Sequence, residues 1–105
     1  MGEAILSKEA KSLNTVTATL TTSGWTQNMA DGSKYQTVNV PGSTAKNIKF
    51  VDVKLTKADI NVEADILEAW ARVNYGDDSV SGKITFWCYG KKPEKDIPVT
   101  VVIAP

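Results

Sequence analysis

The feature that most constrains this chain is an alternation of apolar and polar residues that recurs in short runs. The runs are residues 13–21, 35–40, 48–55, 84–89 and 97–103. A two-residue period of this kind predicts β-strands that each bury one face. Most glycines and prolines stand between the runs, where they mark turns. Pro98 is the exception, and because it cannot donate to a strand ladder we expect it at the start of its strand or on a sheet edge.

One longer segment, residues 57–73, has helical spacing instead. Four of its apolar residues recur at intervals of four, four and three, which places them on one stripe of an α-helix. They are Val62, Ile66, Trp70 and Val73. Thr56 with Asp59 resembles a capping box, and Asn61 is the alternative N-cap. We expect Trp70 to be fully buried and to anchor the helix to a sheet.

The order of these elements is strand, strand, strand, helix, strand, strand. It predicts an α+β fold that is mainly β, either an antiparallel sheet or a β-sandwich, with one covering helix. No internal repeat or linker divides the chain, so residues 13–105 are expected to form a single β-rich domain. Residues 1–12 are rich in helix-forming residues, and we expect an N-terminal tail or a short helix there.

The composition excludes several classes of partner. Twelve basic and twelve acidic residues cancel, so the chain has no global field to attract nucleic acid. No apolar run approaches the roughly 18 residues of a membrane span, and we expect no membrane insertion. Cys88 is the only cysteine, so no internal disulfide can form, which suits a reducing compartment.

Residues 75–78 spell YGDD, a signature of viral RNA-dependent polymerases in which paired aspartates hold two metal ions. In this chain the motif follows a predicted helix and not a strand. The 105 residues are also too few for a polymerase domain that holds template and nucleotide. We therefore interpret the motif as the end of the helix followed by an acidic turn.

The sequence contains no convincing catalytic or cofactor-binding residues. Histidine is absent, which removes Ser–His–Asp and Cys–His nucleophiles and every zinc site that uses imidazole. Residues 76–83 lack the spacing of a phosphate-binding loop. Cys88 alternates with Ile84 and Phe86, so we expect it to point into the core. We predict that the chain is not an enzyme and needs no metal or cofactor.

Exposed aromatic residues are the best candidates for a functional surface. If Ile84, Phe86 and Cys88 face the core, then Trp87 and Tyr89 face the other way. Aromatic rings with nearby lysines can stack on sugar rings or bases, although the helix, a second layer or a neighbouring subunit can also cover them. The predicted interface or glycan-stacking surface consists of Trp87, Tyr89, Lys91, Lys92 and Trp25.

Three groups of residues carry a resemblance to a known family. The first group is Gly24-Trp25, the run YQTVNVPG at 35–42 and Thr44-Ala45; the second is Glu68-Ala69-Trp70; the third is GKITF at 82–86, Lys92-Pro93 and DIPV at 96–99. In this order, over residues 13–103, they resemble a small C-terminal domain of phage and prophage structural proteins from Gram-positive hosts. Those proteins are of the head-fibre, tail-fibre or baseplate type.

The resemblance implies a virion component that is made in the bacterial cytoplasm and is commonly a homotrimer. Such a domain decorates a particle or contacts the host, with other virion proteins or a host surface glycan as its partners. The resemblance carries no catalytic or ligand signature. The alternative function is a carbohydrate-binding module, in which Trp87, Tyr89 and Trp25 stack on sugar rings.

Overall fold

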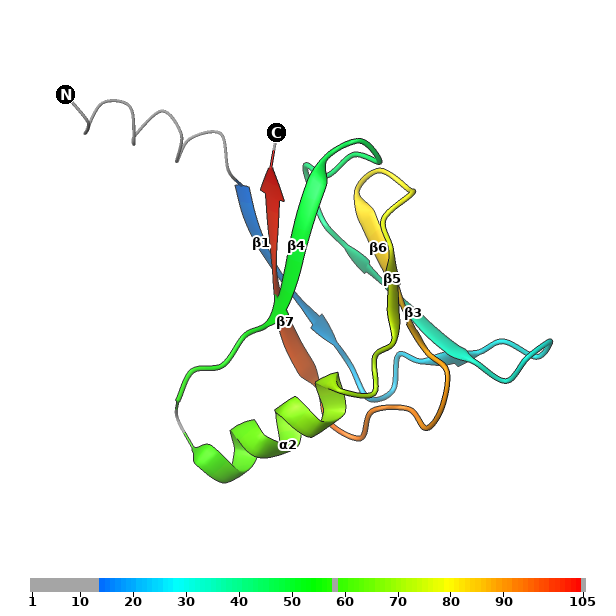
Figure 1. Ribbon diagram of the computed structural model, residues 1–105, viewed down its shortest axis with the longest axis vertical. Helices are drawn as coiled ribbons and strands as arrows, with labels where there is room; N and C mark the ends of the chain where they lie inside the picture. Colours follow the sequence, from blue (N-terminus) through cyan, green and yellow to red (C-terminus); the bar gives the residue numbers. More distant parts are fainter. Residues whose placement is uncertain (1–13, 58, 105) are drawn as a thin grey trace.

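The computed structural model describes residues 14–57 and 59–104, so the predicted N-terminal tail or helix lies outside the described residues. The elements, in chain order, are β1 (Asn14–Leu20), β2 (Thr26–Gln27), β3 (Lys34–Asn39), β4 (Ile48–Val53), α2 (Ile60–Trp70), β5 (Tyr75–Asp77), β6 (Lys83–Cys88) and β7 (Ile97–Ala104). All strand pairs are antiparallel and form two sheets, ordered β1-β7-β4 and β2-β3-β6-β5 (Figure 1). The predicted fold class, α+β and mainly β, is confirmed.

The core lies between the two sheets and is centred on β7. This strand pairs with β1 on one side and with β4 on the other, and every second one of its residues is buried. The buried residues of β7 are Ile97, Val99, Val101 and Ile103. Leu20 of β1 and the buried residues of the four-stranded sheet, among them Val38, Ile84 and Phe86, complete the core. The apolar residues that alternate in the sequence of β7 are therefore the residues that are buried in the core.

Pro98 occupies the second position of β7, a strand that lies in the centre of its sheet. Its carbonyl oxygen accepts a hydrogen bond from the Lys54 backbone N–H at 2.8 Å. The residue is thus placed at the start of its strand, where a missing donor disturbs the ladder least. This is the first of the two positions that the sequence predicts.

Helix α2 is shorter at both ends than the predicted segment 57–73. Asp59 is its N-cap, and the Asp59 side chain accepts hydrogen bonds from the backbone N–H groups of Asn61 at 2.9 Å and Val62 at 3.3 Å. Both N-cap predictions, Thr56 and Asn61, are therefore wrong. A single carboxylate satisfies two of the free N–H groups in the first turn, so no further cap is needed.

The helix packs by its C-terminal half, at one end of the sheets (Figure 1). Ala69 is its buried residue, and the Trp70 ring meets Phe86 edge-on with centroids 6.1 Å apart. Trp70 is nevertheless only half-buried, so the prediction of full burial is wrong. Val62, at the other end of the apolar stripe, is 55% exposed. The sheets therefore cover only the C-terminal part of the apolar stripe.

The burial of β7 leads to a stability prediction that compares a buried and an exposed apolar residue. Ile97→Ala should lower the free energy of unfolding by about 2–5 kcal/mol, because it removes buried methyl groups and leaves a cavity. Val80→Ala, at a side chain that is 58% exposed, should change it by less than about 0.5 kcal/mol. Urea denaturation of both variants measures the difference. Equal losses would contradict a core centred on β7.

Candidate functional site

Three neighbouring strands place an aromatic residue at the same level of the four-stranded sheet. In the register, Trp87 of β6 is opposite Tyr35 of β3 on one side and Tyr75 of β5 on the other. Phe86, the neighbour of Trp87, points into the core, so Trp87 and its two partners point outward. We call Tyr35, Trp87 and Tyr75 the aromatic row.

The aromatic row is partly packed and partly open to solvent. The rings of Tyr35 and Trp87 lie with their centroids 4.9 Å apart and their planes tilted by 42°. Both side chains are half-buried, whereas Tyr75 is 54% exposed. A packed cross-strand pair of this kind restricts the rotamers of both rings. Tyr35 and Trp87 are therefore a fixed apolar pair on the outside of the sheet, whereas Tyr75 stands beside Trp87 in the register and borders a separate hollow that Trp70 and Phe86 also line.

A second row, of polar side chains, lies two residues further along the same strands. The register places Thr85 opposite both Thr37 and Asp77, and the hydroxyls of Thr37 and Thr85 are 2.7 Å apart. We call Thr37, Thr85 and Asp77 the polar row. Together with Tyr35, Trp87 and three residues at 27–29, the polar row lines a shallow hollow of about 560 Å³.

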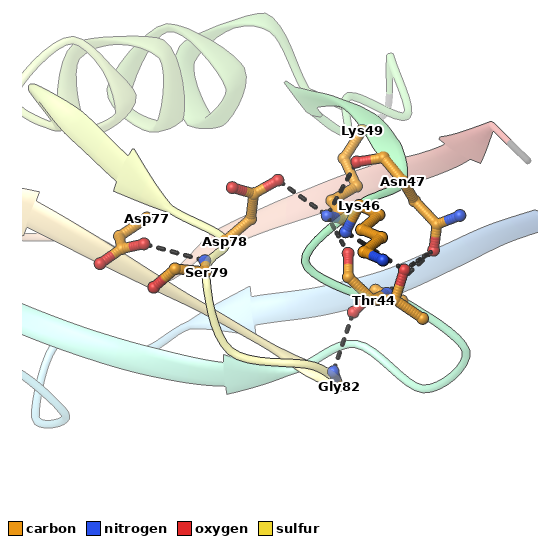
Figure 2. A network of polar contacts seen from close by, with 9 residues as sticks. Thr44, Lys46, Asn47, Lys49, Asp77, Asp78, Ser79 and Gly82 are labelled. Atoms are coloured by element: carbon orange, nitrogen blue, oxygen red, sulfur yellow. Dashed lines mark hydrogen bonds and ion pairs between the residues drawn. The ribbon is translucent and has the colours of Figure 1, made fainter.

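Asp77 brings a fixed negative charge to the polar row. Its carboxylate accepts a hydrogen bond from the backbone N–H of Ser79 at 2.9 Å (Figure 2). This bond, with a further one from the Ser79 hydroxyl, lowers the pKa of Asp77 below its ordinary value of 3.8. The group is therefore ionised at neutral pH, where it is a strong hydrogen-bond acceptor.

The structure separates the five residues that the sequence predicts for the functional surface. Trp87 lines the hollow. Tyr89 is exposed just beyond the end of β6, and its backbone N–H donates to the Asn74 side chain at 2.7 Å. Lys91 forms an ion pair with Glu94, whereas the Lys92 ammonium donates to the Thr22 carbonyl at 3.3 Å. The predicted surface therefore does not gather at one point.

Trp25, the fifth predicted residue, is half-buried and packs against the core. Among the described residues its indole Nε1–H has no hydrogen-bond partner. Trp25 thus lies apart from the aromatic row, and its ring stabilises the inner side of the sandwich.

The sequence does not single out two members of the aromatic row. Tyr35 belongs to a strand whose buried residues are Gln36 and Val38, so a two-residue period places Tyr35 on the outer face. This period is the signal that could have identified it. Tyr75 belongs to β5, a strand that was not predicted. The interpretation of residues 75–78 as a helix end and a turn is wrong, because Tyr75–Asp77 pairs with β6.

The two aspartates of the YGDD motif point in different directions. Asp77 lies with Ser79 on the outer face, and Asp78 reaches across to the ammonium of Lys49 at 2.8 Å (Figure 2). In residues 14–57 and 59–104, no group of three or more Cys, Asp or Glu side chains is placed to hold a metal ion. The paired-aspartate geometry of a polymerase is therefore not formed by Asp77 and Asp78.

Lys49 fastens β4 to the loop that follows β5. Its side chain is 3% exposed, and the ammonium donates to the Asp78 carboxylate and to the backbone carbonyls of Thr44 and Asn47 (Figure 2). These three acceptors use all three N–H groups of the ammonium. The contact joins the edge strand β4 of one sheet to the end of the edge strand β5 of the other.

Cys88 points into the core and is fully buried, as predicted. Burial raises the pKa of its thiol, and the positive charges of Lys34 and Arg72 oppose that rise only in part. A buried thiol with a raised pKa is a poor nucleophile.

Comparison with known proteins gives no match: no family model, curated protein or solved structure is similar to this chain. In the part of the chain that the structure describes, no helix is long and apolar enough to cross a membrane.

The Lys49–Asp78 contact predicts a loss of stability in one variant. Asp78→Asn should lower the free energy of unfolding by about 1–3 kcal/mol, because a nearly buried ammonium loses its counter-charge. Glu94→Gln removes an exposed ion pair with Arg72 and should cost much less. Chemical denaturation at neutral pH compares the two variants, and an equal loss in both would contradict this role for Lys49.

The lowered pKa of Asp77 predicts a pH dependence. Because the folded-state pKa lies below the unfolded value, the stabilisation is complete above the unfolded pKa of about 3.8 and is lost as the pH falls through the folded pKa. The stability difference between the wild type and Asp77→Asn should therefore shrink between about pH 5 and about pH 2. Thermal melts over this range measure it. A difference that does not vary with pH would show that Ser79 does not stabilise the ionised carboxylate.

Proposed function

We propose that this chain is a structural domain of a phage or prophage particle, and that it acts by self-association and surface binding without catalysing a reaction. It is a fibre, tail-appendage or particle-decorating domain, made in the bacterial cytoplasm and incorporated into the virion. The resemblance over residues 13–103 supports the particle assignment. The single structural observation that supports self-association and binding is the presence of exposed apolar side chains on the outer faces of both sheets.

On the three-stranded sheet, the exposed apolar residues gather at one end. Phe50 of β4 is 63% exposed and stands opposite Val102 of β7, and Ile48 stands opposite Ala104. We call Ile48, Phe50, Val102 and Ala104 the apolar patch. Large apolar side chains that lie together on an outer face are typical of an interface. The apolar patch is suited to a second copy of this chain.

Helix α2 offers a further surface for a neighbouring subunit. In its N-terminal half, which lies outside the contact with the sheets, Ile60 and Val62 are exposed, and Leu67 is exposed further along the helix. An amphipathic helix is stable when its apolar stripe is covered, so a neighbouring chain would stabilise this half. A homotrimer is the assembly proposed, with other virion proteins and a host surface glycan as further partners.

A carbohydrate-binding module is the second candidate function, and the aromatic row favours it. Tyr35, Trp87 and Tyr75 stand side by side on the outer face of paired strands, which are a rigid support for stacked sugar rings. The two candidates are compatible, because a particle domain can bind a glycan on the host surface.

The oligomeric state tests the proposed assembly. Light scattering at high protein concentration should give three times the 11.4 kDa mass of one chain. Phe50→Asp should shift the mass toward the monomer by placing a charge in the apolar patch, whereas Thr19→Asp, at an exposed site on the same sheet, should not. A monomeric wild type would contradict the trimeric particle domain. We also expect the gene for this chain to lie among capsid, tail and holin genes.

A further inference from the structure

We propose that the aromatic row and the polar row together form a binding site for a neutral, extended oligosaccharide. This inference rests on the second candidate function and assigns it a site and a class of ligand. The site is the outer face of β3, β6 and β5, where Tyr35, Trp87 and Tyr75 stand beside Thr37, Thr85 and Asp77.

The spacing of the aromatic row suits a chain of sugar rings. Neighbouring strands lie about 5 Å apart, so three side chains at one level form a strip that runs across the strands. One pyranose ring in an extended β-linked chain has a similar length. Successive sugar rings can therefore place their apolar C–H faces on Tyr35, Trp87 and Tyr75.

The polar row supplies the hydrogen bonds that sugar hydroxyls require. Each threonine hydroxyl can both donate and accept, and the pair Thr37–Thr85 uses only part of that capacity. The Asp77 carboxylate is held ionised by Ser79 and keeps lone pairs for a ligand hydroxyl. A sugar ring has an apolar face and a polar edge. The aromatic row can contact the apolar face while the adjacent polar row forms hydrogen bonds with the hydroxyls at the edge.

The charges around the site favour a neutral ligand over a polyanion. Asp77 puts a negative charge next to the aromatic row. Lys83, two residues beyond Thr85 on β6, donates to the Asn39 side chain at 3.1 Å. Lys91 and Lys92 are engaged with Glu94 and Thr22 in and near their own loop. Binding of nucleic acid or a sulfated glycan depends on free cations along the chain. This face instead presents a carboxylate.

The site is also held in place before any ligand arrives. Its six residues stand on hydrogen-bonded strands, and the cross-strand pairs Tyr35–Trp87 and Thr37–Thr85 restrain four of the six side chains. A preorganised site loses less side-chain entropy on binding, which suits the recognition of a flexible and strongly hydrated ligand.

Calorimetric titration of the full chain tests the site. The neutral probes are cellohexaose and chitohexaose, and the anionic probes are hexagalacturonate and a single-stranded oligothymidylate. At least one neutral probe should bind, and Trp87→Ala and Tyr75→Ala should each weaken that binding by about tenfold or more. Thr85→Val, which keeps the shape of the side chain and removes its hydroxyl, should weaken it by a smaller factor.

Leu55→Ala is the control, because it removes an exposed apolar side chain from the connection between β4 and α2, outside both rows and the apolar patch, and it should leave the affinity unchanged. If Trp87→Ala does not fold, Tyr75→Ala still tests the site, because Tyr75 is 54% exposed and its removal should leave the fold intact. Neutral-glycan binding that survives both variants would overturn the site and leave the carbohydrate-binding function standing. Failure of both neutral probes to bind would overturn both. Preferred binding of an anionic probe would overturn the neutral class.

Discussion

The rest of the structure depends on the burial of alternate residues of β7 between its two neighbouring strands and the opposite sheet. Ile97, Val99 and Val101 are completely buried, so a shift of one residue in register would put Thr100 into the core and a valine into solvent. The register of β1 and β4 follows from this constraint. The outward position of Phe50 follows as well, because Val51 and Val53 take the inner face.

The same reasoning links the core to the candidate site on the other sheet. Ile84, Phe86 and Cys88 of β6 are buried, and their burial forces Thr85 and Trp87 outward. Strand pairing then sets Tyr35 and Tyr75 beside Trp87. The aromatic row is thus a consequence of core packing in β6 and of the register of its two neighbours. A ligand that binds there meets a surface held by backbone hydrogen bonds.

The sequence predicts the elements whose signal is local, and it misses those that depend on distant partners. The alternation in β6 and β7 is strong enough to place Cys88 inside and Trp87 outside. The three residues of β5 include Gly76 and Asp77, which are poor strand formers, so only pairing with β6 makes them a strand. The amphipathic stripe predicts α2, but it does not reveal that the sheets are too short to bury Trp70 fully or to cover Val62. The spacing also does not reveal that Asp59, and not Thr56 or Asn61, is the N-cap, because all three residue types are favourable at that position.

The proposed ligand site is the outer face of β3, β6 and β5. NMR titrations of the isotope-labelled chain with cellohexaose and with chitohexaose, read at each backbone amide and at the tryptophan indole signals, test this placement. A ligand bound there should shift the signals of Tyr35, Trp87 and Tyr75, including the indole signal of Trp87, and should leave the indole signals of Trp25 and Trp70 unchanged. Shifts confined to β4 or α2, or no shifts at saturating probe, would contradict it.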